Sequence, residues 1–133
     1  MNSVQIEKIS EGIYNAMICG ETVTPSDELY YKLIDIILFN IEINRCVEII
    51  EFCKNKQSNY IGVGDIEKNF NLIIADLYLQ LGHKSFERSL LVSEAAKLHN
   101  ERHPGRYHFD YYFIYQNEYY TASIVIGGDS NAR

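Results

Sequence analysis

The sequence lacks any uninterrupted apolar segment long enough to cross a membrane. Its longest apolar stretch, Leu33 to Ile43, is interrupted by Asp35, Asn40 and Glu42 and is far shorter than the roughly 20 residues that a membrane-spanning helix needs. The first eight residues also lack the basic region and apolar core of a secretory signal. We therefore expect a protein that is neither exported by that route nor inserted in a bilayer, and that resides in the cytoplasm.

Recognisable catalytic and nucleotide-binding motifs are missing as well. There is no G-x-S-x-G nucleophile elbow and no Walker loop, and Gly62-Val63-Gly64 lacks the third glycine of a dinucleotide-binding fingerprint. The three cysteines form no C-x-x-C pair, and the seven-residue spacing of Cys46 and Cys53 places them on one face of a helix as reduced, buried thiols. These absences favour a protein without a cofactor that is not an enzyme.

Basic residues are scarce in the first part of the chain. Residues 1–53 hold nine acidic residues against three basic ones, whereas residues 54–133 hold nine of each, so the whole net charge of −6 lies in the first 53 residues. An acidic surface repels phosphate backbones and attracts basic partners at long range. We therefore expect a protein partner and no nucleic acid.

The composition itself is that of one globular domain. The chain has 133 residues, of which 47% are hydrophobic and 23% charged, enough to bury a sizeable core without a metal or a disulfide. We expect a single globular domain over residues 1–126 and a flexible C-terminal tail over residues 127–133.

The apolar spacing predicts an α+β fold with about four helices in the N-terminal three quarters. The first helix is expected over residues 3–18, ended by Gly20, and the second from Thr24-Pro25 to about Lys54, with a break near Asn40 as an alternative. The third is expected from Asp65 to Leu81, stopped by Gly82, and the fourth from Ser85 to about Arg102.

An antiparallel β-hairpin packed on these helices is expected to close the domain. Residues 107–115 alternate strictly between two faces, residues 119–126 are rich in β-formers, and Gln116-Asn117-Glu118 form the turn. A two-stranded ribbon alone is marginally stable. It must therefore lie on the helices, find a third strand, for which Tyr60 to Val63 is a candidate, or pair with another copy.

The histidines near the end of the last expected helix suggest an alternative site. His99 and His103 are four residues apart on a helix, so they share a face and could bind a metal together with His108 and Asp110. The same histidines with Arg102 and Arg106 could instead act on a phosphodiester as an acid–base pair. A helix C-terminus, where basic side chains face the negative end of the dipole, explains the cluster without any chemistry.

Tyrosine is the most over-represented residue, with eleven in the chain and six between Tyr107 and Tyr120. Tyrosine gives rigid amphipathic contact area at little entropic cost and is enriched in binding sites. One face of the hairpin is expected to pack inward, while Tyr112 and Tyr120 are candidate anchors for a partner.

In size, acidity, and lack of a signal or a catalytic motif, the chain is similar to small bacterial immunity proteins. That resemblance implies a cytoplasmic inhibitor, monomeric or homodimeric, that binds and neutralises a cognate basic toxin domain, often a nuclease. The steering charges are then expected to be Glu7, Glu11, Asp27, Glu28, Glu48 and Glu51, with Tyr112 and Tyr120 as anchors. The alternatives are an enzyme built on the histidine cluster and a helical assembly protein whose hairpin pairs edge to edge.

Overall fold

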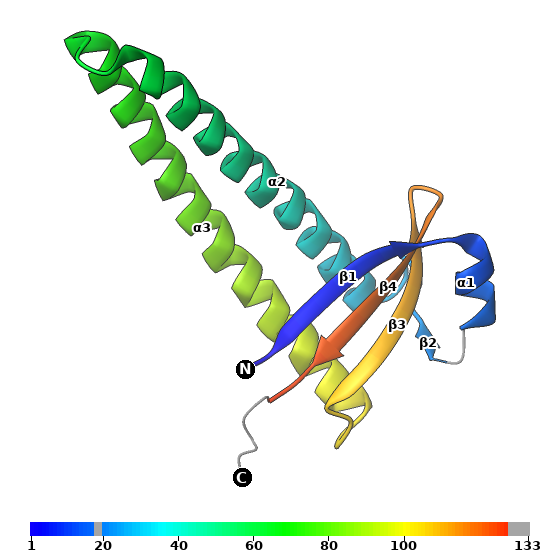
Figure 1. Cartoon of the computed structure of the whole chain (residues 1–133). Helices are drawn as coiled ribbons and strands as arrows, with labels where there is room; N and C mark the ends of the chain where they lie inside the picture. Colours follow the sequence, from blue (N-terminus) through cyan, green and yellow to red (C-terminus); the bar gives the residue numbers. More distant parts are fainter. Residues whose placement is uncertain (18–19, 128–133) are drawn as a thin grey trace. The chain divides into compact units, whose positions relative to one another are not determined.

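Three α-helices and a four-stranded sheet make up the fold of the described residues, 1–17 and 20–127, in a computed structural model of the chain. The elements follow the order β1 (Ser3–Ile9), α1 (Glu11–Ala16), β2 (Glu21–Thr22), α2 (Glu28–Gln57), the short 3₁₀ helix η1 (Ser58–Tyr60), α3 (Gly64–Arg102), β3 (His108–Tyr115) and β4 (Glu118–Val125) (Figure 1). The expected α+β class is confirmed. Over these same residues, no helix is both long and apolar enough to span a membrane.

The sheet is mixed and has the strand order β1-β4-β3-β2. β3 and β4 form the expected hairpin, β1 adds antiparallel to β4, and β2 runs parallel to β3. The third strand is therefore β1, not Tyr60 to Val63, which lies in and just after η1. Both long edges of the hairpin have a neighbouring strand, so the hairpin is the centre of a sheet and not an isolated ribbon.

The prediction of a helix over residues 3–18 is wrong, because residues 3–9 form β1 and only residues 11–16 are helical. Val4 and Ile6 alternate with Gln5 and Glu7, which is the period of a strand as well as part of a helical pattern. Pairing with β4 along the whole of β1 decides between the two. The short helix α1 begins after Ser10, whose side chain accepts a hydrogen bond from the backbone N–H of Ile13 at 3.3 Å.

The second expected helix is found, but it begins later than the Thr24-Pro25 signal indicates. α2 starts at Glu28, and the carboxylate of Asp27 accepts a hydrogen bond from the backbone N–H of Leu29 at 2.8 Å, so Asp27 caps this helix. The helix runs to Gln57 without a break at Asn40.

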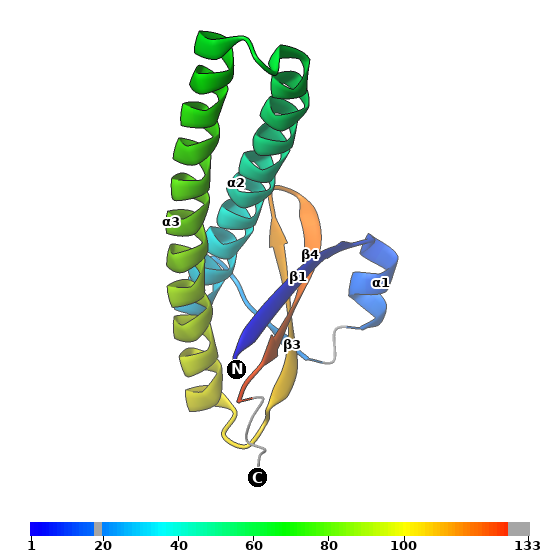
Figure 2. The same cartoon turned by 60° about the vertical axis from the view of Figure 1, so that its left-hand side comes forward.

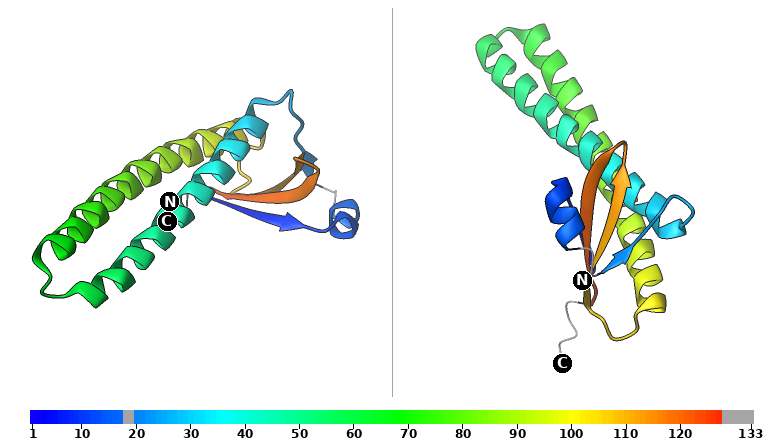
Figure 3. Two further views of the ribbon diagram at one scale, coloured as in Figure 1. Left: turned by 90° about the horizontal axis from the view of Figure 1, so that it is seen from above. Right: turned by 90° about the vertical axis from the view of Figure 1, so that its right-hand side faces the viewer.

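The two helices expected on either side of Gly82 are one helix, so the expected number of four is wrong. α3 runs unbroken from Gly64 to Arg102 (Figure 3). A glycine inside a helix costs only about 1 kcal/mol relative to alanine. The apolar rows on both sides of Gly82, which pack on neighbouring elements, outweigh that cost.

The residue contacts divide the described part of the chain into two compact units. The sheet unit contains residues 1–37 and the part of the chain from Ser89 onward, so it holds the sheet, α1, the start of α2 and the end of α3. The helical unit contains Leu38 to Arg88, the helical hairpin formed by the rest of α2 and α3. The expected tail, residues 127–133, lies outside the described residues except for Gly127.

In the sheet unit, one face of the sheet packs on the helix ends. Tyr111 and Phe113 are fully buried there with Leu29, Leu33 and Ile124, which confirms that one aromatic face of the hairpin points inward. On the other face lies α1 (Figure 2). Its Tyr14 ring contacts the rings of Tyr112 and Tyr119, with centroid distances of 6.2 and 4.9 Å.

The helical unit has its own smaller core between the two helices. It consists of Cys46, Ile50 and Cys53 from α2 and Ile74 from α3, with Phe70, Leu77 and Leu81 packed against them. Cys46 and Cys53 are free and buried, as their seven-residue spacing indicates. Cys19 lies outside the described residues.

Candidate functional site

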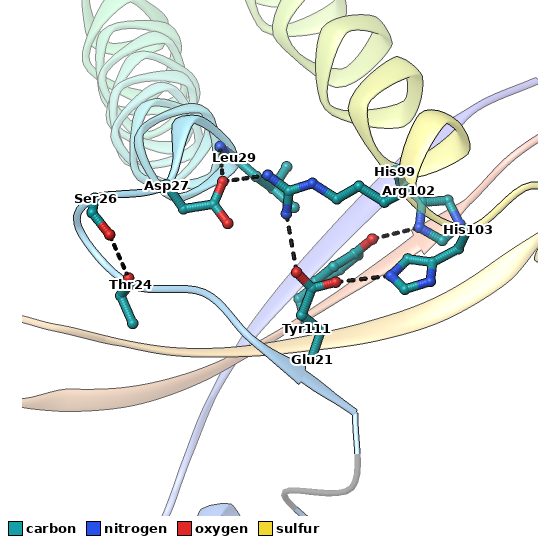
Figure 4. Close-up of polar contacts among 9 residues, drawn as sticks. All are labelled: Glu21, Thr24, Ser26, Asp27, Leu29, His99, Arg102, His103 and Tyr111. Atoms are coloured by element: carbon teal, nitrogen blue, oxygen red, sulfur yellow. Dashed lines mark hydrogen bonds and ion pairs between the residues drawn. The ribbon is translucent and has the colours of Figure 1, made fainter.

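A cluster of polar side chains joins the end of α3 to the segment around β2 within the sheet unit (Figure 4). The cluster contains Glu21, Asp27, His99, Arg102, His103 and Tyr111. His99 and Arg102 come from the last turn of α3, and His103 follows directly after that helix. The acids come from β2 and from the residue before α2. The sequence separates these two groups by more than 70 positions.

Arg102 is the centre of the charged half of this cluster. Its guanidinium donates from Nη2 to Oδ1 of Asp27 at 2.5 Å and from Nη1 to Oε2 of Glu21 at 3.2 Å. The other carboxylate oxygen of Glu21 lies 2.8 Å from Nε2 of His103. The carboxylate of Glu21, in β2, and that of Asp27, just before α2, are thus bound to the end of α3.

The hydrogen bond between Asp27 and Arg102 lowers the pKa of Asp27 and raises the pKa of Arg102. The pKa of Asp27 lies below its ordinary value of 3.8 chiefly because of the hydrogen bond from Arg102, and also because of the Leu29 N–H and the positive charge, against the effect of burial. The pKa of Arg102 is raised by the hydrogen bond to Asp27. Both groups are therefore held in their charged forms.

His99 forms the neutral half of the cluster and is fully buried. Its Nε2 lies 2.6 Å from the carbonyl oxygen of Arg106, and its Nδ1 lies 2.6 Å from the hydroxyl of Tyr111. A carbonyl can only accept, so Nε2 carries a proton and donates to it, while Nδ1 is hydrogen-bonded to the tyrosine hydroxyl. Burial raises the pKa of Tyr111, with a further contribution from the charge of Glu21, so its hydroxyl stays a donor.

The structure does not bring the four candidate metal ligands together. His99 and His103 both stack on Phe109, on the inner face of β3, whereas His108 and Asp110 alternate onto the other face. His108 instead lies 2.7 Å from the hydroxyl of Ser123. Within residues 1–17 and 20–127, no group of three or more His, Cys, Asp or Glu side chains is arranged to hold a metal ion.

The buried polar atoms of the cluster are hydrogen-bonded to one another and to the neighbouring backbone. Both ring nitrogens of His99 are engaged, and Arg102 is shared between two carboxylates. In the part of the chain that the structure describes, no buried side-chain nitrogen or oxygen lacks a hydrogen-bond partner. These hydrogen bonds make the cluster a clamp between the end of α3, β2 and the start of α2.

The expected steering acids are divided between the two units. Glu7 lies on β1, Glu11 in the first turn of α1 and Glu28 in the first turn of α2, all exposed in the sheet unit. Glu48 and Glu51 are exposed on α2 in the helical unit. Asp27 is engaged by Arg102 and by the Leu29 N–H, so its charge is largely compensated.

Most of the net negative charge lies in the sheet unit. By sequence, that unit holds eleven acidic and six basic residues, whereas the helical unit holds seven and six. Three of the sheet unit's bases, Lys8, Lys32 and Arg102, are already paired with acids of the same unit. Glu7, Glu11 and Glu28 form no ion pair within the described residues.

The two tyrosines expected as anchors are covered to different degrees. Tyr112 is only 4% exposed and has the ring of Tyr14 against it. Tyr120 is half-buried and stacks on Phe113 at 5.3 Å, on the inner face of the sheet. The more exposed tyrosines are others, among them Tyr107 at 64% and Tyr31 at 57%. Strand alternation alone gave no signal for this, because the cover on Tyr112 comes from α1.

Comparisons of the chain with protein-family models, with curated proteins and with solved structures find no match. The geometry of the described residues defines an α+β protein with an acidic sheet unit, a hydrogen-bonded polar clamp, and a helical hairpin that exposes large apolar side chains.

Proposed function

We propose that the protein is an acidic binding module that neutralises a cognate basic protein domain, in the manner of a bacterial immunity protein acting in the cytoplasm. The observation that carries the proposal is the excess of five acidic residues in the sheet unit, where Glu7, Glu11 and Glu28 are exposed and form no ion pair among the described residues. Charges of this kind are free to act on a partner, because no neighbouring cation compensates them.

Glu7 and Glu11 are the main steering residues in this proposal. Glu7 is opposite Thr121 of β4, on the face of the sheet that also carries Tyr112 and α1. Glu11 follows at the start of α1. A basic domain approaching this face meets two uncompensated carboxylates, which raise the rate of encounter and fix its orientation.

Glu28 has a second role, which makes it a less specific candidate for a steering residue. It lies in the first turn of α2, where a carboxylate also stabilises the positive end of the helix dipole. Asp27 belongs to the clamp, and we propose that it supports the binding face without steering. Glu48 and Glu51 lie in the nearly neutral helical unit and are proposed to contribute less.

The proposal excludes a direct nucleic-acid ligand, since the face that it uses is acidic. An enzyme built on His99, His103, His108 and Asp110 gains no support, because the sheet separates these residues onto two faces.

Co-purification with the product of the gene directly upstream tests the proposal, because an immunity gene normally lies behind its toxin. The tagged full chain is expected to retain that product as a one-to-one complex at low salt and to lose it progressively as the salt concentration rises. The absence of a complex at both salt concentrations would overturn the proposal.

A further inference from the structure

A stripe of exposed side chains runs along α3 within the helical unit, on a face that does not contact α2. The buried row of α3 consists of Phe70, Ile74, Leu77 and Leu81. The stripe lies on another side of the helix and consists of Leu72, Ala75, Leu79, Gly82 and Phe86. Leu72, Leu79 and Phe86 are 61%, 63% and 61% exposed. A row of large apolar side chains this open to water marks an interaction surface.

The stripe alternates large and small residues at coiled-coil spacing. Leu72, Leu79 and Phe86 are seven residues apart, and Ala75 and Gly82 lie between them at three- and four-residue steps. The side chains around the two small residues form a groove of about 590 Å³, lined by Ala75, Tyr78, Leu79, Gly82, His83 and Phe86. A methyl group added at Gly82 would meet nothing within 4 Å, so no contact inside the described chain requires glycine there.

We propose that this stripe binds the same stripe of a second copy of the chain, with the two α3 helices antiparallel. A two-fold axis that crosses the helix pair midway between positions 80 and 81 places position 79 of one copy opposite position 82 of the other. It likewise places position 75 opposite position 86. Each Leu79 then packs against Gly82 of the other copy, and each Phe86 packs against Ala75. A two-fold contact must be complementary to itself, and the alternation of this stripe meets that requirement.

The other orientation does not meet it. In a parallel, in-register pair, Phe86 meets Phe86 and Gly82 meets Gly82, which leaves one crowded layer beside one empty layer. Antiparallel pairing gives each of these two layers one large and one small residue. It also gives Gly82 a role, since a glycine lets a neighbouring helix approach closely at a position where it otherwise only weakens α3.

The charges at one edge of the stripe fit the same arrangement. Asp76 and His83 are seven residues apart and flank the stripe on the same side. The two-fold axis places Asp76 of each copy near His83 of the other, so an acid meets a base or a hydrogen-bond donor twice. Like charges do not meet at this edge, which favours a second copy over an unrelated acidic or basic helix.

Sedimentation equilibrium of the full chain over a range of concentrations tests the proposal. The wild type is expected to dimerise, and Leu79→Glu is expected to raise the dissociation constant at least about tenfold. Ile73→Glu is the matched control, because Ile73 is also exposed, at 48%, on the same helix but on the other side of the buried row. Its dissociation constant should stay within about threefold of the wild type, the size of an ordinary surface effect.

A size swap tests whether Ala75 and Phe86 lie in the contact. Ala75→Phe and Phe86→Ala are each expected to weaken the dimer, the first by crowding and the second by leaving a cavity. Mixing the two variants should restore a heterodimer, because each layer again holds one large and one small residue, and the Ala75→Phe/Phe86→Ala double variant should also recover. Circular dichroism confirms that every variant keeps its helices.

A chain that is monomeric at all concentrations overturns the proposal, as does a dimer that Leu79→Glu leaves intact. A dimer that is weakened by Leu79→Glu but shows no recovery in the mixture or the double variant overturns the placement of Ala75 and Phe86 in the contact. A disulfide that forms in Ala75→Cys alone, instead of between Ala75→Cys and Phe86→Cys in a mixture, overturns the antiparallel orientation. The proposal concerns the helical unit alone, and its outcome is independent of the partner proposed for the sheet unit.

Discussion

The hydroxyl of Tyr111 lies 2.6 Å from Nδ1 of His99, and both side chains are fully buried. The second ring nitrogen of His99 meets the carbonyl of Arg106, so the ring connects the last turns of α3 to β3 and to the loop between them. A histidine held in this way is a structural residue with a fixed tautomer.

Removing the tyrosine hydroxyl therefore leaves Nδ1 of His99 buried without a partner. Tyr111→Phe is expected to lower the free energy of unfolding by about 1–3 kcal/mol, the cost of an unsatisfied buried polar group. Urea denaturation followed by circular dichroism measures it. Tyr107→Phe removes the same hydroxyl from a side chain that is 64% exposed and should change stability by less than about 0.5 kcal/mol. Equal effects at the two positions would contradict a structural role for the His99–Tyr111 bond.

The Asp27–Arg102 contact predicts a specific dependence of stability on pH. A carboxyl whose pKa is lower in the folded than in the unfolded chain adds stability above its unfolded pKa, about 3.9, and loses that contribution as the pH falls through the folded value. Asp27→Asn should cost about 2 kcal/mol at neutral pH, because it removes a charged hydrogen bond and weakens a helix cap.

The difference between Asp27→Asn and the wild type should shrink as the pH falls below about 4. Asp35→Asn, at an exposed position of α2, serves as the control and should leave the pH dependence close to that of the wild type. A difference that stays constant from neutral pH to pH 2 would show that the charge of Asp27 is not what stabilises the fold.

Gly20 is required by the close approach of β3. A methyl group there would lie 2.7 Å from the carbonyl oxygen of Asp110 and 3.0 Å from the ring of Tyr112. Gly20→Ala is therefore expected to destabilise the protein by about 1–3 kcal/mol through overpacking. Gly12→Ala, in α1, meets nothing within 4 Å and should be neutral or stabilising by up to about 1 kcal/mol. Thermal unfolding of both variants distinguishes the two environments.

The turn between β3 and β4 offers a stabilising substitution. Gln116 and Asn117 both have positive φ, at 52° and 64°, as a two-residue type I′ turn requires. Glutamine adopts this conformation less readily than asparagine does. Gln116→Asn should raise the free energy of unfolding by about 0.5 kcal/mol, measured by urea denaturation. A loss of stability would mean that the side chain of Gln116 contributes contacts that outweigh its backbone strain.

Charge reversal tests where the steering charge lies. Glu7→Lys/Glu11→Lys in the sheet unit and Glu48→Lys/Glu51→Lys in the helical unit change the net charge equally. The first pair should slow association with the cognate partner by about tenfold or more at low salt and flatten its salt dependence, whereas the second should act weakly. Stopped-flow or surface-based kinetics give both rates. Equal slowing by the two pairs would show that only the total charge matters.

Much of the fold follows from local patterns in the sequence. The α+β class, the β3–β4 hairpin, the long helix α2 and the end of a helix near Arg102 all follow from the spacing of apolar residues, because local periodicity reports which face of an element is buried. The inward packing of one aromatic face of β3 is of the same kind. Residues 3–9 show the limit of such patterns, since their short apolar alternation fits a helix or a strand and only pairing with β4 selects the strand.

The sequence by itself determined the composition, the acidic excess and the type of the longest elements, because these depend on residues close together in the chain. Only the tertiary structure decided the partners of the charges and rings: Glu21 and Asp27 reach Arg102 across more than 70 residues, and β3 separates His108 from His99. It also decided that α3 passes through Gly82 unbroken and that α1 covers Tyr112. Contacts between distant segments carry no local period, so they are fixed only when the whole chain is packed.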